Sequence, residues 1–364
     1  MRIFVTLAYT LLFTFVLSAS SFSSHLKNKS KKEKEKYLEI RIAKIPSEFN
    51  QIKIAPAKIK KNFSKSIIKN KKTIKIDKSM KNSSLLSVIY YDGKKIVVDK
   101  KSDKISNDTK LYSMSISKSF VSYILGNAIC NKYIKSINDK ISMYVPETKG
   151  TLYENSTFRD LINMSAGDIN FSNRKPGSAT STYVDQVIVK KKSVKEYLLS
   201  SAGKKITVKK FNYNNFLTDL VARAIDVTVP GGLKKSYTDF ANKSETNYEM
   251  FFLTDKDGWP LLHGWFYATR EDFLRLGVQI AEDWNSKSCI GDYLNFVENM
   301  KSKASENSSY SGFFWYDDHI QSRHAEMRGH GGQRIHINLN KGSVLINHSI
   351  ANDYDNKSIL DLIR

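Results

Sequence analysis

The residues best suited to covalent chemistry are Ser115 and Lys118, three positions apart in the segment Leu111–Phe120. At a helix start this spacing puts both side chains on one face, and the hydroxyl lies near the positive end of the helix dipole. A serine hydroxyl is a weak nucleophile until a neighbour takes its proton, and a lysine does so only where burial or nearby cations lower its pKa. The pair therefore predicts a nucleophilic serine with a lysine as proton acceptor. Ser113 and Ser117 have no lysine three residues on, so Ser115 is the specific choice.

Strand patterns at both ends of the chain must help to position this pair. We predict one hairpin over residues 86–98, around a turn at Asp92-Gly93, and a second over residues 334–346, around a turn at 340–342. A short helix is expected at 357–363. Apolar and polar residues alternate along these strands, as in a sheet with one buried face.

Between the two strand-rich ends the pattern is mostly helical. Residues 116–129 have apolar side chains at helical spacing, and Thr157–Asp160 and Thr269–Asp272 resemble capping boxes that begin two further helices. We therefore predict an α+β fold in which the N- and C-terminal parts form an antiparallel β-sheet flanked by helices, with a mostly helical region inserted at roughly 113–310. A binding cleft is expected where the sheet and the helices meet.

Three motifs in this order resemble the serine β-lactamase and penicillin-binding-protein superfamily. The first is Ser-x-x-Lys-Ser-Phe at Ser115. The second is Phe211-Asn-Tyr-Asn-Asn215, which matches the Tyr-x-Asn motif of the class C branch. The third is Gly329-His-Gly-Gly-Gln333, directly before a predicted strand. The resemblance runs from about Leu85 to Ile363 and is closest in look to class C-type esterases and 6-aminohexanoate-dimer (nylon oligomer) hydrolases.

The resemblance implies a β-lactamase/transpeptidase-like fold and a role for each motif residue. Ser115 would form the acyl-enzyme, Lys118 would share its proton, and Tyr213 would be the general acid/base that activates Ser115 and protonates the leaving group. The backbone N–H groups of Ser115 and Gln333 would form the oxyanion hole. The remaining substrate-contacting positions implied are Asn215, which would also orient the Lys118 ammonium, together with His330, Gly331 and Gly332.

Two departures from the family pattern bear on the substrate. The third motif normally contains Lys or Arg, a permanent cation for a substrate carboxylate, whereas His330 has an ordinary pKa near 6.5 and would be mostly neutral at pH 7. The Pro-Gly that usually precedes the second motif is replaced by Val208-Lys-Lys210. Penicillin-like recognition is therefore not expected, and the geometry of the second-motif loop is left open. We assign no role to His263 and His324.

The N-terminal segment suggests export. Arg2 is followed by an apolar stretch and by small residues at 18–21, which predicts a signal peptide over 1–22 and a periplasmic or secreted protein; an uncleaved membrane anchor is the alternative. Residues 23–82 are Lys-rich and are expected to bury little, with one docking element near Tyr37 to Ile45. The hydrolase domain is expected to span 83–364.

Charge and cysteine content limit the partners. The net charge is +22, but the lysines are spread through the chain, so we expect no nucleic-acid partner and only a general attraction to anionic cell-envelope polymers. Cys130 and Cys289 are either a disulfide or two buried thiols, and we favour the thiols. No cluster of side chains has metal-ligand spacing, so no metal or other cofactor is expected.

The sequence thus predicts a serine hydrolase that cleaves a small ester or amide. Two alternatives stay open: a D,D-peptidase or β-lactamase acting on cell-wall-like substrates, and a non-catalytic envelope-binding protein with the same fold.

Overall fold

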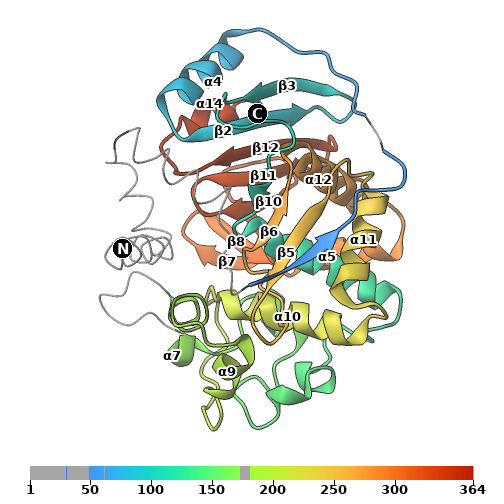
Figure 1. Ribbon diagram of the computed structural model, residues 1–364, viewed down its shortest axis with the longest axis vertical. Helices are drawn as coiled ribbons and strands as arrows, with labels where there is room; N and C mark the ends of the chain where they lie inside the picture. The colour runs from blue at the N-terminus through green and yellow to red at the C-terminus, as the bar shows by residue number, and fades with distance from the viewer. Residues whose placement is uncertain (1–29, 31–48, 61, 173–180, 364) are drawn as a thin grey trace, which may run out of the picture.

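The chain forms a large antiparallel sheet built from both ends of the sequence. The computed structural model describes residues 30, 49–60, 62–172 and 181–363. In the described residues the sheet has eight strands in the order β3-β2-β12-β11-β10-β9-β8-β7, so β2, from the N-terminal part of the chain, pairs with β12, from its C-terminal part (Figure 1). The strands are β2 (Leu85–Tyr91), β3 (Ile96–Lys101), β7 (Ser302–Ser305), β8 (Ser308–Ser311), β9 (Phe314–Asp317), β10 (His324–Gly329), β11 (Gln333–Asn338) and β12 (Ser343–Ser349).

Both predicted hairpins are confirmed. In the first, the Asp92 carboxylate accepts the main-chain N–H groups of Lys94 and Lys95, both at 2.9 Å, and Gly93 supplies a φ of 103° that other residues rarely adopt. In the second, β11 and β12 pair antiparallel, and β12 then pairs with β2. The pairing of β12 with β2 joins the two ends of the domain in one sheet. Folding of this sheet therefore depends on contacts between segments that are distant in the sequence.

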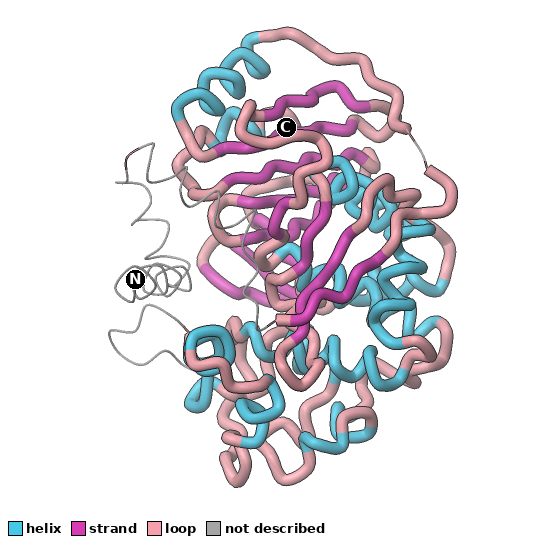
Figure 2. Tube along the Cα trace, viewed as in Figure 1, coloured by secondary structure: helices cyan, strands magenta, loops and turns pink. Residues whose placement is uncertain are grey.

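Helices cover both faces of this sheet (Figure 2). On one face Gly277 of α12 lies so close to β11 and β12 that a Cβ there would be 3.0 Å from Ile335 and 3.2 Å from Val344. On the other face Ile76 of α4 and Ile359 of α14 belong to a separate apolar cluster with β12. The helices are α4 (Lys71–Asn82), α5 (Ile116–Cys130), α12 (Arg270–Trp284), α13 (Cys289–Asn299) and α14 (Asn356–Leu360).

The inserted region is mostly helical, as predicted, but it also contributes to a second sheet that the sequence did not suggest. This sheet has four strands in the order β1-β5-β6-β4. Its strands are β1 (Asn50–Ile54), β4 (Leu111–Tyr112), β5 (Met250–Thr254) and β6 (Phe266–Ala268). The helical elements are η2 (Ile141–Met143), η3 (Pro146–Thr148), α6 (Phe158–Ile162), α7 (Ile169–Ser172), α8 (Thr182–Val184), η4 (Asp185–Val189), α9 (Val194–Leu199), α10 (Asn215–Thr228) and α11 (Gly232–Lys243).

The Lys-rich segment before the predicted domain contributes more than its composition suggested. Strand β1 pairs with β5 over its full length, and α4 begins at a capping box formed by Asn70 and Thr73. The predicted signal peptide and the expected element near Tyr37 to Ile45 lie outside the described residues. In the part of the chain that is described, no helix is long and apolar enough to span a membrane.

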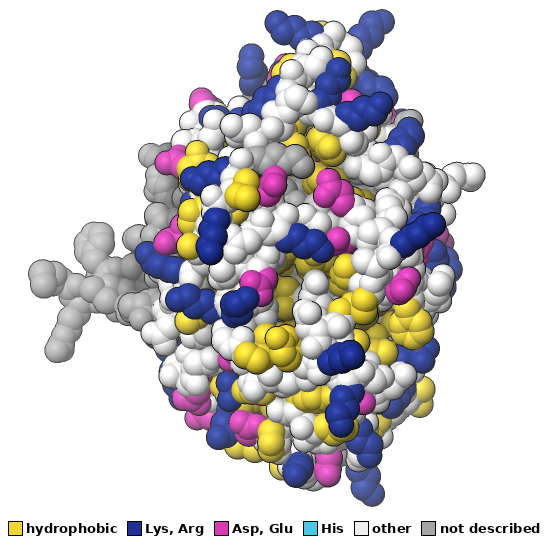
Figure 3. Space-filling model, turned by 90° about the vertical axis from the view of Figure 1, so that its right-hand side faces the viewer, with side chains coloured by type: hydrophobic (Ala, Val, Ile, Leu, Met, Phe, Trp, Pro, Cys, Tyr) yellow, Lys and Arg dark blue, Asp and Glu magenta, His cyan; other side chains and the backbone are white. Residues whose placement is uncertain are grey.

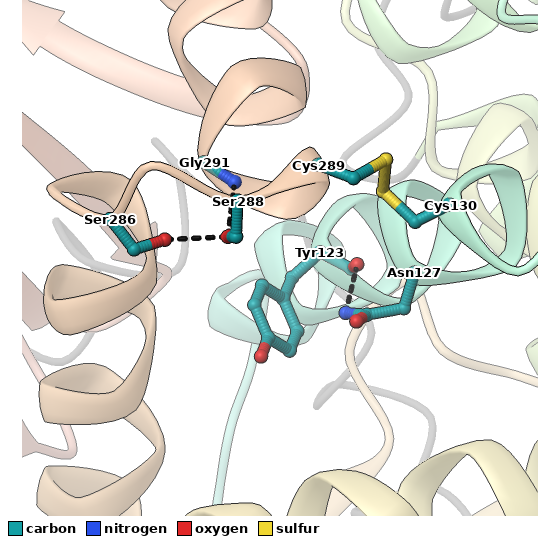
Figure 4. Close-up of a disulfide and its surroundings, with 7 residues drawn as sticks. All are labelled: Tyr123, Asn127, Cys130, Ser286, Ser288, Cys289 and Gly291. Atoms are coloured by element: carbon teal, nitrogen blue, oxygen red, sulfur yellow. Dashed lines mark hydrogen bonds between the residues drawn. A yellow bond between two sulfur atoms is a disulfide. The ribbon is translucent and has the colours of Figure 1, made fainter.

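The expectation of two free thiols is wrong. Cys130, at the end of α5, and Cys289, at the start of α13, form a disulfide with a Cα–Cα distance of 5.7 Å (Figure 4). The two residues are 159 positions apart in the sequence, so only the packing of α5 beside α13 brings them within bonding distance.

Candidate active site

Ser115 lies at the N-terminus of α5 with its hydroxyl available for chemistry. It occupies the N-cap position but its side chain makes no capping hydrogen bond. The preceding residue, Met114, has a φ of 48°, a left-handed conformation that costs energy for a side chain of this size. Such strain persists only where surrounding contacts hold it.

Those contacts come from the segment between β5 and β6. Ser113 Oγ donates to the Gly264 carbonyl at 3.0 Å, and Ser117 Oγ donates to the Leu262 carbonyl at 2.7 Å. The Lys118 ammonium donates to the carbonyl between them, that of His263. Three consecutive carbonyls therefore fix the first turn of α5.

Lys118 lies beside Ser115 on the first turn of α5. Its Nζ lies 3.0 Å from Ser115 Oγ, and the side chain is 1% exposed. Burial lowers the pKa of Lys118 to about 7, while the negative charge of Asp219 acts in the opposite direction. A substantial share of Lys118 is then neutral at physiological pH, which a proton acceptor requires.

The loop that carries Tyr213 is held by a buried carboxylate. Asp168 accepts the side-chain amide of Asn212 at 2.8 Å and that of Asn214 at 2.6 Å. The Asn212 main-chain N–H also donates to the Met164 carbonyl at 2.7 Å. These bonds on either side of Tyr213 define its backbone position.

The Tyr213 side chain reaches the pair on α5. The Lys118 Nζ lies 5.4 Å from the centre of its ring, and the ring stacks against Trp315 with centroids 5.8 Å apart. Burial raises the pKa of Tyr213 to about 12, and its hydrogen bond with Ser115 acts in the opposite direction. The residue as a whole is 37% exposed, so part of it borders solvent, while the phenol keeps its proton at neutral pH.

The third motif forms the turn between β10 and β11, next to the backbone that precedes Ser115. A Cβ on Gly329 would lie 3.0 Å from both Met114 Cβ and the Ser113 carbonyl. His330, Gly331 and Gly332 make the turn, and Gln333 begins β11 opposite Gly329. This turn and the N-terminus of α5 therefore lie side by side.

Two of the predicted substrate residues have surroundings that differ from the expectation. Gly332 faces Tyr354, because a Cβ there would lie 2.5 Å from that ring, and its carbonyl accepts the Asn347 amide at 2.6 Å. Packing thus already requires this glycine. Asn215 is the first residue of α10, and among the described residues no hydrogen bond joins it to Lys118; the His263 carbonyl orients that ammonium.

A buried carboxylate that the sequence motifs did not reveal lies near Lys118. Asp219 of α10 accepts hydrogen bonds from His263 and from the Tyr183 hydroxyl. A signal was present, since Asp219 is the one carboxylate among the buried residues of α10, most of which are apolar.

Neither His324 nor any other described group suggests a metal site. His324 Nε2 accepts the Asp317 N–H at 2.9 Å, and its Nδ1 lies 2.7 Å from the Ser322 carbonyl, so the ring serves the local structure. Across the described ranges, no three His, Cys, Asp or Glu side chains are grouped so as to hold a metal ion.

Basic side chains are scattered over the surface. On the face shown in Figure 3, Lys and Arg lie in many separate places with acidic residues among them.

The fold is that of the β-lactamases and penicillin-binding proteins, which confirms the predicted fold class. No protein-family model and no curated protein matches the sequence. Among solved structures, the chain is similar to a Bacillus anthracis protein described as a 6-aminohexanoate-dimer hydrolase, with TM-score 0.69, 14% identity and coverage of 92% of this chain and 93% of that one.

Two further solved structures have the same fold. A D-stereospecific amidohydrolase from Streptomyces sp. has TM-score 0.60 and 12% identity, covering 80% of this chain and 96% of its own. A class C β-lactamase from Rhodobacter sphaeroides has TM-score 0.58 and 12% identity, covering 81% of this chain and 99% of its own. At these identities the likeness establishes the architecture, and the chemistry must be argued from the site.

Proposed function

We propose that this protein is a serine hydrolase that cleaves a small ester or amide through an acyl-enzyme on Ser115. The observation that carries the proposal is the buried Lys118 Nζ, 3.0 Å from Ser115 Oγ and with a pKa near 7, beside the Tyr213 phenol. A neutral amine at hydrogen-bond distance from a hydroxyl is the arrangement that general-base activation needs.

In the first half of the reaction Lys118 takes the Ser115 proton as Oγ attacks the substrate carbonyl. The negative charge that develops on the carbonyl oxygen would be stabilised by the N–H groups of Ser115 and Gln333. When the tetrahedral intermediate collapses, the Tyr213 phenol gives its proton to the departing alcohol or amine and recovers one from the Lys118 ammonium. The acyl group remains on Ser115.

In the second half a water molecule attacks the acyl-enzyme carbonyl. Lys118, neutral again, accepts the proton of the water, directly or through Tyr213, and returns a proton to Ser115 Oγ as the acid is released. A phenol with a pKa near 12 fits the donor role better than that of a resting base. We therefore assign Lys118 as the initial base and Tyr213 as the proton donor.

The chemistry around the site favours substrates that need no permanent cation in the third motif. His330 takes the place of the family's Lys or Arg, and the Tyr213 ring packs with Trp315 and with Tyr310, whose centroid is 6.0 Å away. An aromatic wall beside the nucleophile suits an apolar acyl or leaving group. The site is compatible with an amide or an ester substrate. So are the hydrolases that share this fold.

We also propose that the protein acts outside the cytoplasm. The apolar N-terminal segment suggests export, and a disulfide between Cys130 and Cys289 persists in oxidising compartments. N-terminal sequencing of protein recovered from the cell exterior should find cleavage near residue 22, and a protein that retains Met1 inside the cell contradicts this part of the proposal.

The test of the reaction is labelling by a fluorophosphonate probe followed by intact-mass measurement. Wild type should gain one adduct, Ser115→Ala none, and Ser119→Ala should label normally because the Ser119 hydroxyl, on the same helix, is occupied with the Phe313 carbonyl at 2.6 Å. Hydrolysis of a short-chain nitrophenyl ester should exceed that of a chromogenic cephalosporin. The reverse order would favour a β-lactamase or D,D-peptidase, and absence of labelling in wild type would favour a non-catalytic protein.

A further inference from the structure

A buried carboxylate that the reaction does not use directly lies behind Lys118. Asp219 is 0% exposed and accepts three hydrogen bonds. The His263 main-chain N–H donates to Oδ1 at 2.7 Å, the His263 ring Nδ1 lies 2.6 Å from Oδ2, and the Tyr183 hydroxyl donates to Oδ2 at 2.6 Å. An ionised carboxylate is costly to bury unless it is fully hydrogen-bonded, so these three contacts explain how α10 tolerates it.

The contacts of Asp219 continue to the catalytic pair through one stretch of backbone. The peptide that joins Leu262 to His263 is held at both ends, because its N–H donates to Asp219 and its carbonyl accepts the Ser117 hydroxyl. The next carbonyl, that of His263, accepts the Lys118 ammonium. Displacement of Asp219 would therefore remove the hydrogen bond that holds the His263 backbone. The His263 carbonyl would then no longer orient the Lys118 amine.

We infer that Asp219 is a positioning residue of the hydrolase: through His263 it holds the carbonyl that orients Lys118, and it places a buried negative charge near the amine. The inference rests on the proposed function, in which Lys118 is the proton acceptor. Its electrostatic part agrees with the environment of the lysine, where burial lowers the pKa and the Asp219 charge opposes that effect.

Few other groups near this network can change charge at neutral pH. Tyr213 faces Lys118 from the loop before α10, and Tyr183 faces Asp219 from α8; burial raises the pKa of both phenols, so both remain neutral. Asp255, which follows β5, acts electrostatically on Tyr183. Besides these phenols, the ionisable side chains that make up the network are Asp219, Lys118 and His263.

The experiment is a pH profile of kcat/KM for a nitrophenyl ester, which reports the ionisation of the free enzyme. Asp219→Asn keeps the shape but removes the charge. The acidic limb of the profile reports loss of the Lys118 proton. In Asp219→Asn this limb should move to lower pH, because the Lys118 ammonium loses its favourable interaction with the Asp219 charge. We also expect kcat to fall by about 10²-fold, as for a small displacement of a catalytic group.

The matched control is Asp283→Asn. Asp283 of α12 is also a buried carboxylate bonded to a tyrosine, the Tyr123 hydroxyl, and it accepts Lys243 at 2.8 Å, but it contacts the middle of α5 and not its first turn. This variant should lower the melting temperature and leave the acidic limb where it is in wild type. An Asp219→Asn profile with the limb unmoved overturns the inference.

A second variant keeps the inference testable if Asp219→Asn does not fold. Tyr183→Phe removes one donor and preserves the charge, so kcat should fall roughly tenfold, the effect of one lost buried hydrogen bond, with the limb unmoved. A wild-type kcat in this variant would refute the positioning role. Labelling of Ser115 in wild type separates this outcome from failure of the proposed function, since without labelling the hydrolase itself is wrong.

Discussion

The two ends of helix α5 are held in place by different means. At the N-terminus, Ser117 and Lys118 donate to buried carbonyls of the 262–264 segment, beside the strained Met114. At the C-terminus, a disulfide joins Cys130 to the exposed Cys289 (Figure 4). The N-terminal end thus depends on hydrogen bonds between buried polar groups. The C-terminal end has a covalent link at the surface, which makes no contact with Ser115 or Lys118.

The largest effect is expected from removing the amine at the N-terminal end of α5. Lys118→Met should reduce kcat by about 10³-fold, in the range of general-base contributions, because Ser115 loses its proton acceptor. Steady-state kinetics on folded protein measure this effect. Lys195→Met, at an exposed lysine of α9, is the control, and equal losses in the two variants would show that Lys118 has no special role.

Removing the disulfide at the C-terminal end of α5 should lower the stability of the protein and leave its activity unchanged. The double variant Cys130→Ser, Cys289→Ser should lose about 2–5 kcal/mol of unfolding free energy, because the disulfide closes a long loop. Urea denaturation measures this loss. Below the melting transition kcat/KM should equal that of wild type; a loss of activity in the folded variant would mean that the two ends of the helix are coupled.

A third prediction uses pH to compare wild type with Lys118→Met. The pKa of Lys118 is about 7 in the folded protein and near 10.5 in an unfolded chain. Between these values the unfolded chain binds the additional proton, so this lysine makes stability rise with pH across that window. The stability of Lys118→Met relative to wild type should therefore decrease by roughly 2–4 kcal/mol from pH 7 to pH 10. A constant difference would contradict the lowered pKa.

The smallest effect concerns the helix caps. Thr157 caps α6 by accepting the Asp160 N–H at 3.1 Å, so Thr157→Ala should cost about 1 kcal/mol. Ser115 makes no such bond, and Ser115→Ala should cost much less. Thermal denaturation of the two variants makes the comparison, and an equal loss would indicate that Ser115 stabilises the helix.

Local patterns were sufficient for much of the architecture. The alternation and turn residues at 86–98 and 334–346 predicted the hairpins, and the spacing of Ser115 and Lys118 predicted their contact, because these depend on residues close in sequence. Strand β1 was missed because its apolar alternation is limited to Ile52 and Ile54, too short a pattern to stand out within a Lys-rich region; its pairing with β5 stabilises it.

The order of the residues specifies which side chains are available for chemistry and on which local elements they lie. Packing of distant segments brings Cys130 to Cys289, places the His263 carbonyl against the Lys118 amine, and buries Asp219 beside His263. The physical reason is that burial, and with it the lowered pKa of a lysine or the cost of a carboxylate, depends on segments that are distant in the chain and come together only when the whole domain packs.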